Sequence, residues 1–162
     1  MPAWELLKPF SVCRGLIEKD LRRLSEFVEE RVLSDGEDLY SGHERPAGVV
    51  FVVSGKMAVS ILPSGAGEEA SVEVGPGETM AELSLFEAGP PAVSARSAGE
   101  SRILFLPRHG FESWAARSPE GAVLFQARIL ADVGRRLRRL EGALRLVAGV
   151  AAESAGREET TQ

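Results

Sequence analysis

The sequence lacks the marks of several common protein classes. Its single cysteine, Cys13, cannot form an internal disulfide, and a chain with one thiol fits a reducing cytoplasm. No apolar run approaches the roughly 20 residues that cross a bilayer, and the first residues lack the basic start and apolar run of a signal peptide. We therefore expect a cytoplasmic globular protein without membrane spans, in which Cys13 is an inert core residue.

Residues and motifs that carry catalysis are also scarce. The two histidines, His43 and His109, lie on opposite sides of a β-rich region, whereas a cupin-type metal site needs more imidazoles. The chain has no Gly-x-Ser-x-Gly elbow, no phosphate-binding Gly-Lys-Ser/Thr loop and no His-Glu-x-x-His stretch. We therefore expect no catalytic residue, no metal site and no enzyme.

Basic residues are few and unevenly placed. The net charge of −5 argues against binding of nucleic acid by the whole chain, because phosphate contacts need Lys and Arg. Between Met57 and Ala95 there is no Lys or Arg, whereas there are six glutamates. The densest basic run, 135–139, resembles a nucleic-acid patch, but beside the leucines of a helix it is more simply a solvated flank.

The chain falls into three parts within one predicted domain, residues 1–150. Apolar residues at helical spacing predict amphipathic helices over residues 4–30. Residues 31–107 alternate short β-rich runs with Gly- and Pro-rich turns, which predicts a small barrel or jelly roll. Ser54-Gly55 predicts a sharp hairpin between two of these runs. The predicted strands are Gly48–Val53, Met57–Leu62, Glu69–Val74, Ala92–Ser97 and Ser101–Leu106.

Helical spacing returns over residues 108–148. Pro119 is suited to the first turn of a long helix, where its missing N–H costs little. This helix carries an a/d pattern over nearly three heptads, which indicates a dimer interface, although Gly134 and Gly142 weaken it. The interface residues are Leu130, Val133, Leu137, Leu140 and Leu144, with Val147 continuing the pattern. The small, polar residues 151–162 are predicted to form a disordered tail.

One stretch, 75–86, has the pattern of an anion cradle. It is expected to form a strand end, a Pro-Gly turn and a short helical turn, whose backbone N–H groups aim at a point outside the helix start. The predicted ligand-binding residues are Gly77, Ala81, Glu82, Leu83, Ser84, Ala92 and Val93. Each also has a structural reading: the glycines suit turns, and Glu82 could interact with the helix dipole or with solvent.

From about Leu6 to Leu140 the chain resembles the cyclic-nucleotide-binding domain family, the sensor half of catabolite-activator (Crp/Fnr-type) regulators. The resemblance is carried by an ordered series of motifs: Asp35-Gly-Glu, Gly42, Val49-Val-Phe-Val-Val-Ser-Gly-Lys-Met-Ala-Val-Ser60, Gly75-Pro-Gly-Glu and Ile103-Leu-Phe-Leu-Pro-Arg108 before Phe111. It implies N-terminal helices, an eight-stranded jelly-roll-like β-roll and a long C-terminal helix.

The resemblance also implies a ligand site inside the β-roll and shows where this chain departs from it. The family motif is Gly-Glu followed about ten residues later by Arg-Ser/Thr-Ala. Here Ala81 precedes Glu82, and Pro91 or Ala92 stands at the arginine position, while Arg96 lies too far along. Loss of a buried cationic partner typically costs about 2–5 kcal/mol. Three arginines of the long helix or of a partner subunit are candidate replacements: Arg128, Arg135 and Arg136.

The resemblance thus implies a non-catalytic regulatory module for signal transduction. It would be a homodimer through the long helix that senses a small ligand, with cyclic AMP, cyclic GMP or another cyclic nucleotide bound weakly or in an altered way. The alternative is a ligand-free scaffold for dimerisation or protein interaction. After Val150 only about a dozen residues follow, fewer than a helix-turn-helix needs. A complete chain would therefore act through a partner, whereas a fragment would lack its output domain.

Overall fold

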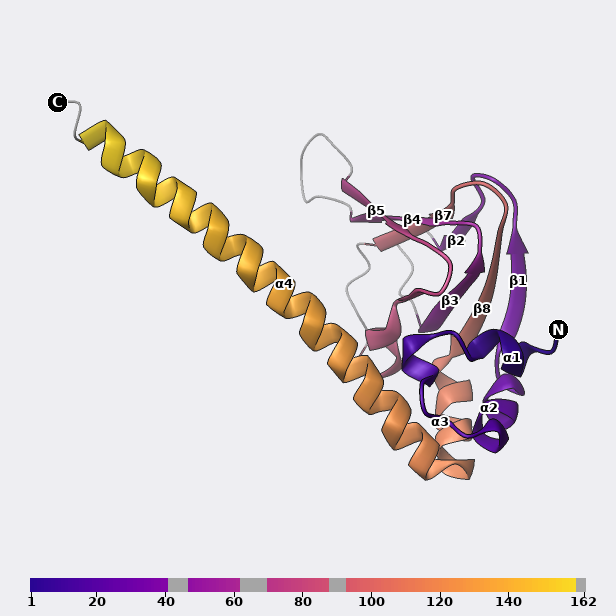
Figure 1. The fold of residues 1–162 in the computed structure, drawn as a ribbon. Coiled ribbons are helices and arrows are strands. Elements are labelled where there is room, and N and C mark those ends of the chain that lie inside the picture. The colour runs from indigo at the N-terminus through magenta and orange to yellow at the C-terminus, as the bar shows by residue number, and fades with distance from the viewer. Residues whose placement is uncertain (41–46, 62–69, 88–92, 160–162) are drawn as a thin grey trace. The chain divides into compact units, whose positions relative to one another are not determined.

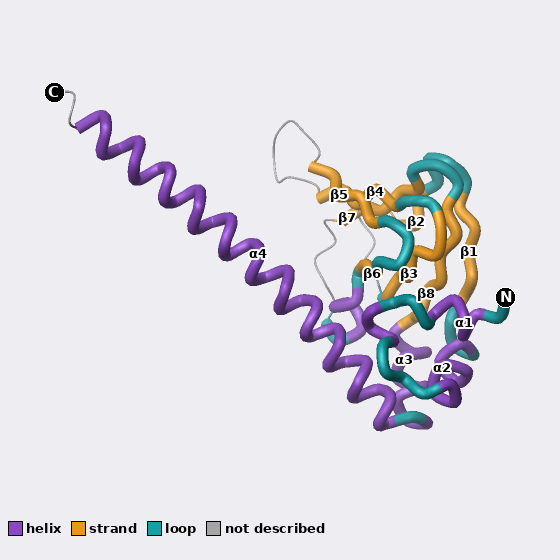
Figure 2. The backbone as a smooth tube through the Cα atoms, viewed as in Figure 1, coloured by secondary structure: helices purple, strands orange, loops and turns teal. Residues whose placement is uncertain are grey.

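The computed structural model describes residues 1–40, 47–61, 70–87 and 93–159. The chain divides into two compact units, residues 1–128 and 129–162. The first unit holds two antiparallel four-stranded sheets and the helices at their base (Figures 1 and 2). This arrangement confirms the predicted jelly-roll-like β-roll with flanking helices.

Each sheet combines strands that are distant in sequence. The first has the order β1-β8-β3-β6 and the second the order β2-β7-β4-β5, and the described strand pairs are antiparallel. The strands are β1 (Glu29–Leu33), β2 (Asp38–Tyr40), β3 (Gly48–Ser54), β4 (Met57–Ile61), β5 (Ala70–Val74), β6 (Thr79–Met80), β7 (Val93–Ser97) and β8 (Ser101–Pro107). The five strands predicted from the sequence correspond to β3, β4, β5, β7 and β8.

The core of the roll lies between the two sheets. Strand β3 contributes Val50 and Val52, and the second sheet contributes Met57 and Ala95, all of them at most 1% exposed. Leu33, Met80 and Ile103 complete this cluster, and Leu39, Tyr40, Val59, Val74 and Phe105 pack against it. Side chains of a strand alternate between its two faces, so every second residue of β3 enters this core.

The remaining residues of β3 face a second core formed with the helices. Phe51 meets Phe10 edge-to-face at 5.0 Å between ring centroids, and Val49 beside it is fully buried. Because both faces of β3 are covered, its sequence reads as a continuous apolar run rather than an alternation. The helices are α1 (Ala3–Leu7), the 3-10 turn η1 (Ser11–Cys13), α2 (Glu18–Ser25), α3 (Arg108–Arg117) and α4 (Pro119–Glu159).

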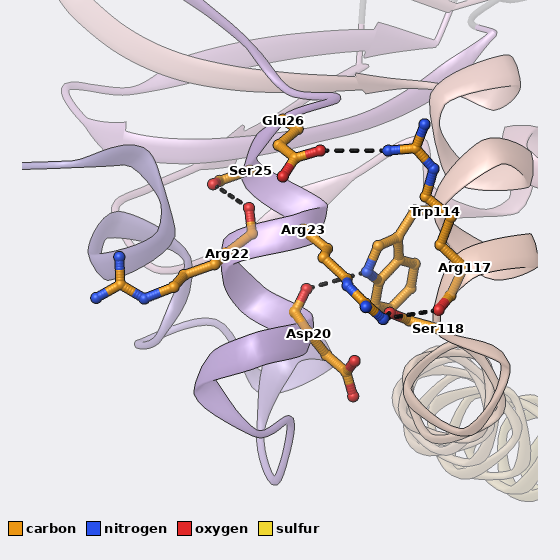
Figure 3. A network of polar contacts seen from close by, with 8 residues as sticks. All are labelled: Asp20, Arg22, Arg23, Ser25, Glu26, Trp114, Arg117 and Ser118. Carbon is orange, nitrogen blue, oxygen red and sulfur yellow. Dashed lines mark hydrogen bonds and ion pairs between the residues drawn. The ribbon is translucent and has the colours of Figure 1, made fainter.

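Polar contacts join α2 to the junction between α3 and α4 (Figure 3). The indole N–H of Trp114 donates to the carbonyl of Asp20 at 3.0 Å. Arg23 donates to the carbonyl of Arg117 at 2.8 Å and to the hydroxyl of Ser118 at 3.3 Å. These contacts cross about ninety residues of sequence, so they hold the N-terminal helices to the helices that follow the roll.

The Ser54-Gly55 turn forms, but the hairpin predicted around it is wrong. Strands β3 and β4 flank the turn yet belong to different sheets, so the turn is a corner between them. Gly55 has a φ of 79°, and a Cβ there would lie 2.4 Å from the carbonyl oxygen of Glu100. The amide of Lys56 donates to the hydroxyl of Ser101, so the start of β8 occupies the space that a hairpin partner would need.

The long helix extends further than its apolar pattern predicted. Helix α4 continues to Glu159, whereas the sequence indicated a disordered tail from residue 151. The segment 151–159 is rich in Ala and Glu, which have high helix propensities, and these favour continuation without an apolar face. The first turns of α4 belong to the first unit, and its residues 129–159 form the described part of the second unit.

Candidate functional site

The chain enters the candidate cradle through a left-handed residue. After β6, Ala81 has a φ of 60° and a ψ of 21°, and the 3-10 turn η2 (Glu82–Leu85) follows directly. Among the described residues, Ala81 alone combines a side chain with a positive φ. Because alanine has a Cβ, this conformation costs about 1–2 kcal/mol. Residue 81 therefore adopts a left-handed backbone conformation that suits glycine, although it is an alanine.

Ser84 ties η2 to the sheet. Its hydroxyl accepts a hydrogen bond from the N–H of Gly48 at 2.9 Å, and it lies 2.8 Å from the Gly48 carbonyl and 2.6 Å from the Ala81 carbonyl, to one of which it donates. Ser84 is 6% exposed. A Cβ on Gly48 would lie 2.3 Å from the carbonyl oxygen of Leu106, so only glycine fits there. The Ser84 hydroxyl is thus hydrogen-bonded to the protein's own backbone.

Two contacts tie η2 to the helices. Arg108, the first residue of α3, donates from Nε to the Ser84 carbonyl at 2.9 Å, and its Nη2 donates to the same oxygen. Beside it, the ring of Phe86 meets Phe111 edge-to-face at 5.8 Å. Phe111 in turn lies 5.8 Å from Phe125 of α4. Polar and aromatic contacts therefore run together from η2 to α3 and the first turns of α4.

The Glu82 carboxylate is buried at the edge of the roll interior. It is 2% exposed, so the reading in which it interacts with solvent is wrong. Tyr40, which packs against the core between the sheets, lies within its electrostatic reach. Burial raises the pKa of Tyr40 to about 12, and the negative charge of Glu82 adds to this shift. The pair therefore presents a neutral phenol beside a carboxylate.

The other predicted ligand residues are placed less centrally. Gly77, with a φ of 84°, forms an exposed turn and donates its N–H to the Val52 carbonyl at 2.9 Å. Leu83 is 56% exposed. Val93 is the first residue of β7, and Ala92 lies outside the described residues, as do Gly42 and His43. The described structure thus brings Ala81, Glu82 and Ser84 together, with Gly77 on the preceding turn.

Arg96, which lies too far along for the family motif, and the candidate replacement arginines of the long helix have contacts of their own. Arg96 pairs with Asp38 across β7 and β2 at 2.8 Å, and both side chains are about half exposed or more. Arg128 donates to the carbonyl of Arg14 at 3.3 Å, and Arg135 pairs with Asp132. The pair with Asp38 holds Arg96 on the outer surface of the second sheet, away from the roll interior.

The predicted dimer residues on α4 are exposed. The side chains at the heptad positions are Leu130 (73% exposed), Leu137 (54%), Leu140 (62%), Leu144 (69%) and Val147 (67%), with Val133 partly exposed. Residues three, four and seven apart share one face of a helix. An apolar stripe of this length, at least half exposed at each leucine, is the kind of surface that mates with another helix.

Sequence reasoning missed two parts of the site. Arg108 was quoted only as the end of a strand motif, and nothing in its neighbours pointed to a carbonyl 24 residues away. Tyr40 was not selected, although a single tyrosine at the end of a β-run was a weak signal.

No described helix is long and apolar enough to cross a membrane. The described residues also contain no cluster of three His, Cys, Asp or Glu side chains that could hold a metal ion.

Known proteins share this fold. The profile of the cyclic nucleotide-binding domain family matches residues 30–118. A CRP-like cAMP-activated global transcriptional regulator of Mycobacterium tuberculosis is 25% identical over 135 residues, which are 83% of this chain and 58% of that protein. The chain therefore spans less than two thirds of the length of this curated relative.

Solved structures agree with the profile. The catabolite activator protein of Thermus thermophilus has a TM-score of 0.73 at 24% identity, covering 85% of this chain and 63% of that one. The N-terminal domain of a transcriptional regulator from Streptomyces coelicolor A3(2) has a TM-score of 0.70 at 26% identity, covering 86% of this chain and 94% of that one. The shared fold includes both sheets and the flanking helices.

Proposed function

Because the chain belongs to the cyclic nucleotide-binding domain family, we propose that it is a non-catalytic regulatory module that senses a small ligand in its β-roll. It acts in the cytoplasm as a homodimer through α4, and it binds cyclic AMP, cyclic GMP or a related molecule weakly or in an altered way. The observation that carries this proposal is the buried Glu82 at the start of η2, inside a fold shared with cAMP-activated regulators.

The contacts of η2 support a mechanism for sensing. A ligand that moves Glu82 also moves Ser84, which is bound to Gly48 on one side and to Arg108 on the other. Phe86 carries the displacement through Phe111 to the first turns of α4. A ligand that binds one position of η2 better than another therefore shifts the population of α4 states. The altered α4 changes the dimer interface, which is the output of the module.

The charges beside the apolar stripe support dimerisation with parallel helices. If Leu130, Leu137 and Leu144 occupy the a positions, Arg136 falls at a g position and Glu141 at the following e position. In a parallel dimer these two positions face each other across the interface, so the pair is complementary. Two such pairs form in a symmetric dimer, and they fix the register of the leucines.

Calorimetric titration tests the sensor. Cyclic AMP, cyclic GMP and cyclic dinucleotides are titrated into the full chain, and the melting temperature is measured with each at saturation. Binding by any one of them stabilises the folded state by mass action, so the melting temperature rises. No heat and no rise with every ligand would refute nucleotide sensing.

The charge distribution favours a second candidate function, a dimerisation scaffold that has kept the fold without the ligand. No Lys or Arg occurs between Met57 and Ala95, and Arg96 is paired with Asp38 outside the roll. A scaffold predicts that Glu82→Ala leaves partner binding intact, whereas Leu137→Glu abolishes it. A sensor predicts that both substitutions matter.

A further inference from the structure

A second face of α4, distinct from the leucine stripe, is apolar at its centre. Its residues are spaced three and four apart, so they share one side of the helix. With Leu137 and Leu144 at a positions, they occupy c, f and g positions, and the c and f residues lie on the side away from the seam of the proposed dimer. We call this set the outer face: Arg139, Gly142, Ala143, Leu146, Gly149, Val150 and Glu153.

The apolar centre of the outer face is exposed. Leu146 is 74% exposed and Val150 is 64% exposed. A Cβ added to Gly142 or to Gly149 would meet no atom within 4 Å, so the space beside both glycines is open. Positions opposite a paired seam normally carry polar side chains, as Arg135 does one heptad before Gly142. Pairing through the leucine stripe therefore leaves this apolar patch uncovered.

The two ends of the outer face carry opposite charges. Arg139 and Glu153 are both exposed, and each lies seven residues from Leu146, which is about 10 Å along the helix on either side. If a second α4 lies antiparallel with the two Leu146 side chains together, each Arg139 opposes a Glu153. A parallel copy in register would oppose like charges instead, which repel. The charges therefore select the antiparallel arrangement.

Size is complementary in the same arrangement. Val150 lies four residues after Leu146 and Gly142 lies four residues before it, so the valine of each copy opposes a glycine of the other. Ala143 and Gly149, three residues to either side, oppose each other in the same way. The distance between two packed helices depends on the side chains at their contact, so the glycines permit a close approach.

We propose that α4 pairs a second time, antiparallel with α4 of another copy of this chain, through the outer face. One face supplies both charges and both halves of the packing, which is what a contact between two identical surfaces requires. The contact lies on a different side of α4 from the leucine stripe, so it joins the proposed dimers into larger assemblies. It does not depend on the ligand of the β-roll.

The outer contact should be weaker than the leucine stripe. Its apolar part, residues 142–150, spans just over two helical turns, whereas the stripe extends over nearly three heptads. Less apolar area is therefore removed from water. We expect assemblies larger than a dimer to form at concentrations at which pairing through the stripe is already complete.

Charge exchange tests the pairing. Arg139→Glu and Glu153→Arg each turn two attractive pairs into two repulsive ones, so each should weaken association beyond the dimer at least about fivefold. The variant that carries both substitutions restores the attraction with its direction reversed and should associate as the parent does. Arg138→Glu makes the same change of charge one residue away, off the outer face, and is the matched control.

Analytical ultracentrifugation over a range of concentrations measures the parent and these variants. A parent that forms nothing larger than a dimer at every concentration would refute the inference. A combined variant that associates no better than the single ones would also refute it.

Thiol cross-linking locates the contact. Cys13 is only 2% exposed, so a thiol introduced on α4 is the one that reacts. Oxidation of Leu146→Cys should link two chains at least about tenfold faster than oxidation of Ala152→Cys, which is exposed but lies off both faces. Leu144→Cys reports pairing through the leucine stripe, so loss of the proposed dimer is distinguished from loss of the outer contact. Equal rates for Leu146→Cys and Ala152→Cys would overturn the inference.

Discussion

Two nitrogens of Arg108 converge on the carbonyl oxygen of Ser84, so the first residue of α3 closes the end of η2. The same serine uses its hydroxyl to hold Gly48 of β3. One residue of the cradle is therefore bound from both sides, by its side chain to the sheet and by its backbone to the helices. A displacement of η2 cannot remain local, because it must break or carry these contacts.

Removing the guanidinium is expected to destabilise the fold. Arg108→Ala should lower the free energy of unfolding by about 1–2 kcal/mol, since a hydrogen bond from a charged donor to a buried carbonyl is lost. Arg108→Lys should give a free energy of unfolding between those of the parent and of Arg108→Ala, because an ammonium group cannot donate from two nitrogens as the guanidinium does. Urea denaturation measures both, with Lys19→Ala as an exposed control. An effect of Arg108→Ala no larger than that of the control would contradict the prediction.

Ser84→Ala should cost about 1–3 kcal/mol, because it leaves the N–H of Gly48 without its hydroxyl partner in a buried position. Ser113→Ala, on the exposed face of α3, serves as the matched control and should change the unfolding free energy little. Chemical denaturation measures the unfolding free energy of both variants. If Ser84→Ala is as stable as the parent, the hydroxyl does not hold η2 to β3.

Ala81→Gly should stabilise the protein, in contrast to the usual effect of glycine. Glycine relieves the strain of the left-handed backbone, while it increases the entropy of the unfolded chain, and the net gain is expected to be below about 1 kcal/mol. Ala127→Gly, in an exposed turn of α4, should instead cost about 1 kcal/mol. The two variants are therefore expected to shift the melting temperature in opposite directions. Shifts of the same sign would contradict backbone strain at Ala81.

Alkaline pH should destabilise the fold through Tyr40. The phenol loses its proton near pH 10.0 in the unfolded chain and near pH 12 in the folded one, so the stabilising contribution is complete below pH 10 and is lost between these values. Because Tyr40 is the only tyrosine, the ultraviolet absorbance of tyrosinate reports its titration directly. Glu82→Gln should lower the midpoint only partly, since burial is the larger cause. A midpoint near pH 10 in the folded protein would contradict the burial.

Leu137→Glu should prevent dimerisation by placing a carboxylate in the middle of the apolar stripe on α4. Arg138→Glu, one residue away and off that stripe, should leave the dimer intact and is the matched control. Analytical ultracentrifugation over a range of concentrations distinguishes the two. A Leu137→Glu variant that sediments as a dimer would exclude this face as the interface.

Much of the fold could be predicted from the sequence because local signals and tertiary packing agree there. The Gly- and Pro-rich turns separate strands with apolar runs, and the helical period returns after residue 107. The prediction failed at Ser54-Gly55, because turn chemistry does not reveal which strand will pair with β3. It also failed after residue 151, where helix propensity rather than an apolar face continues α4.

The candidate site was predicted in part. Glu82 was selected from a motif, and the structure adds its burial, which no property of the neighbouring sequence reveals. Ser84 was expected to meet a ligand, whereas its hydroxyl is bound to the backbone of Gly48, 36 residues earlier. Such contacts depend on how distant segments of the chain pack together, so the spacing of residues in the sequence does not predict them. The roles of Ala92 and Val93 in ligand binding remain predictions.

The strands of the roll should tolerate random substitution unequally. Strand β3 has one set of side chains in the core between the sheets and the other against the helices, so every residue from Val49 to Val52 is constrained. On the outer surface of the second sheet, Glu73 of β5 and Arg96 of β7 both lie beside Ala58 of β4, and both are exposed. In a deep mutational scan, β3 would therefore form a continuous intolerant block, whereas β7 would alternate between intolerant positions such as Ala95 and permissive ones such as Arg96. Evolutionary change in surface properties is consequently excluded from β3 and left to strands with an exposed face, such as β1 and β7.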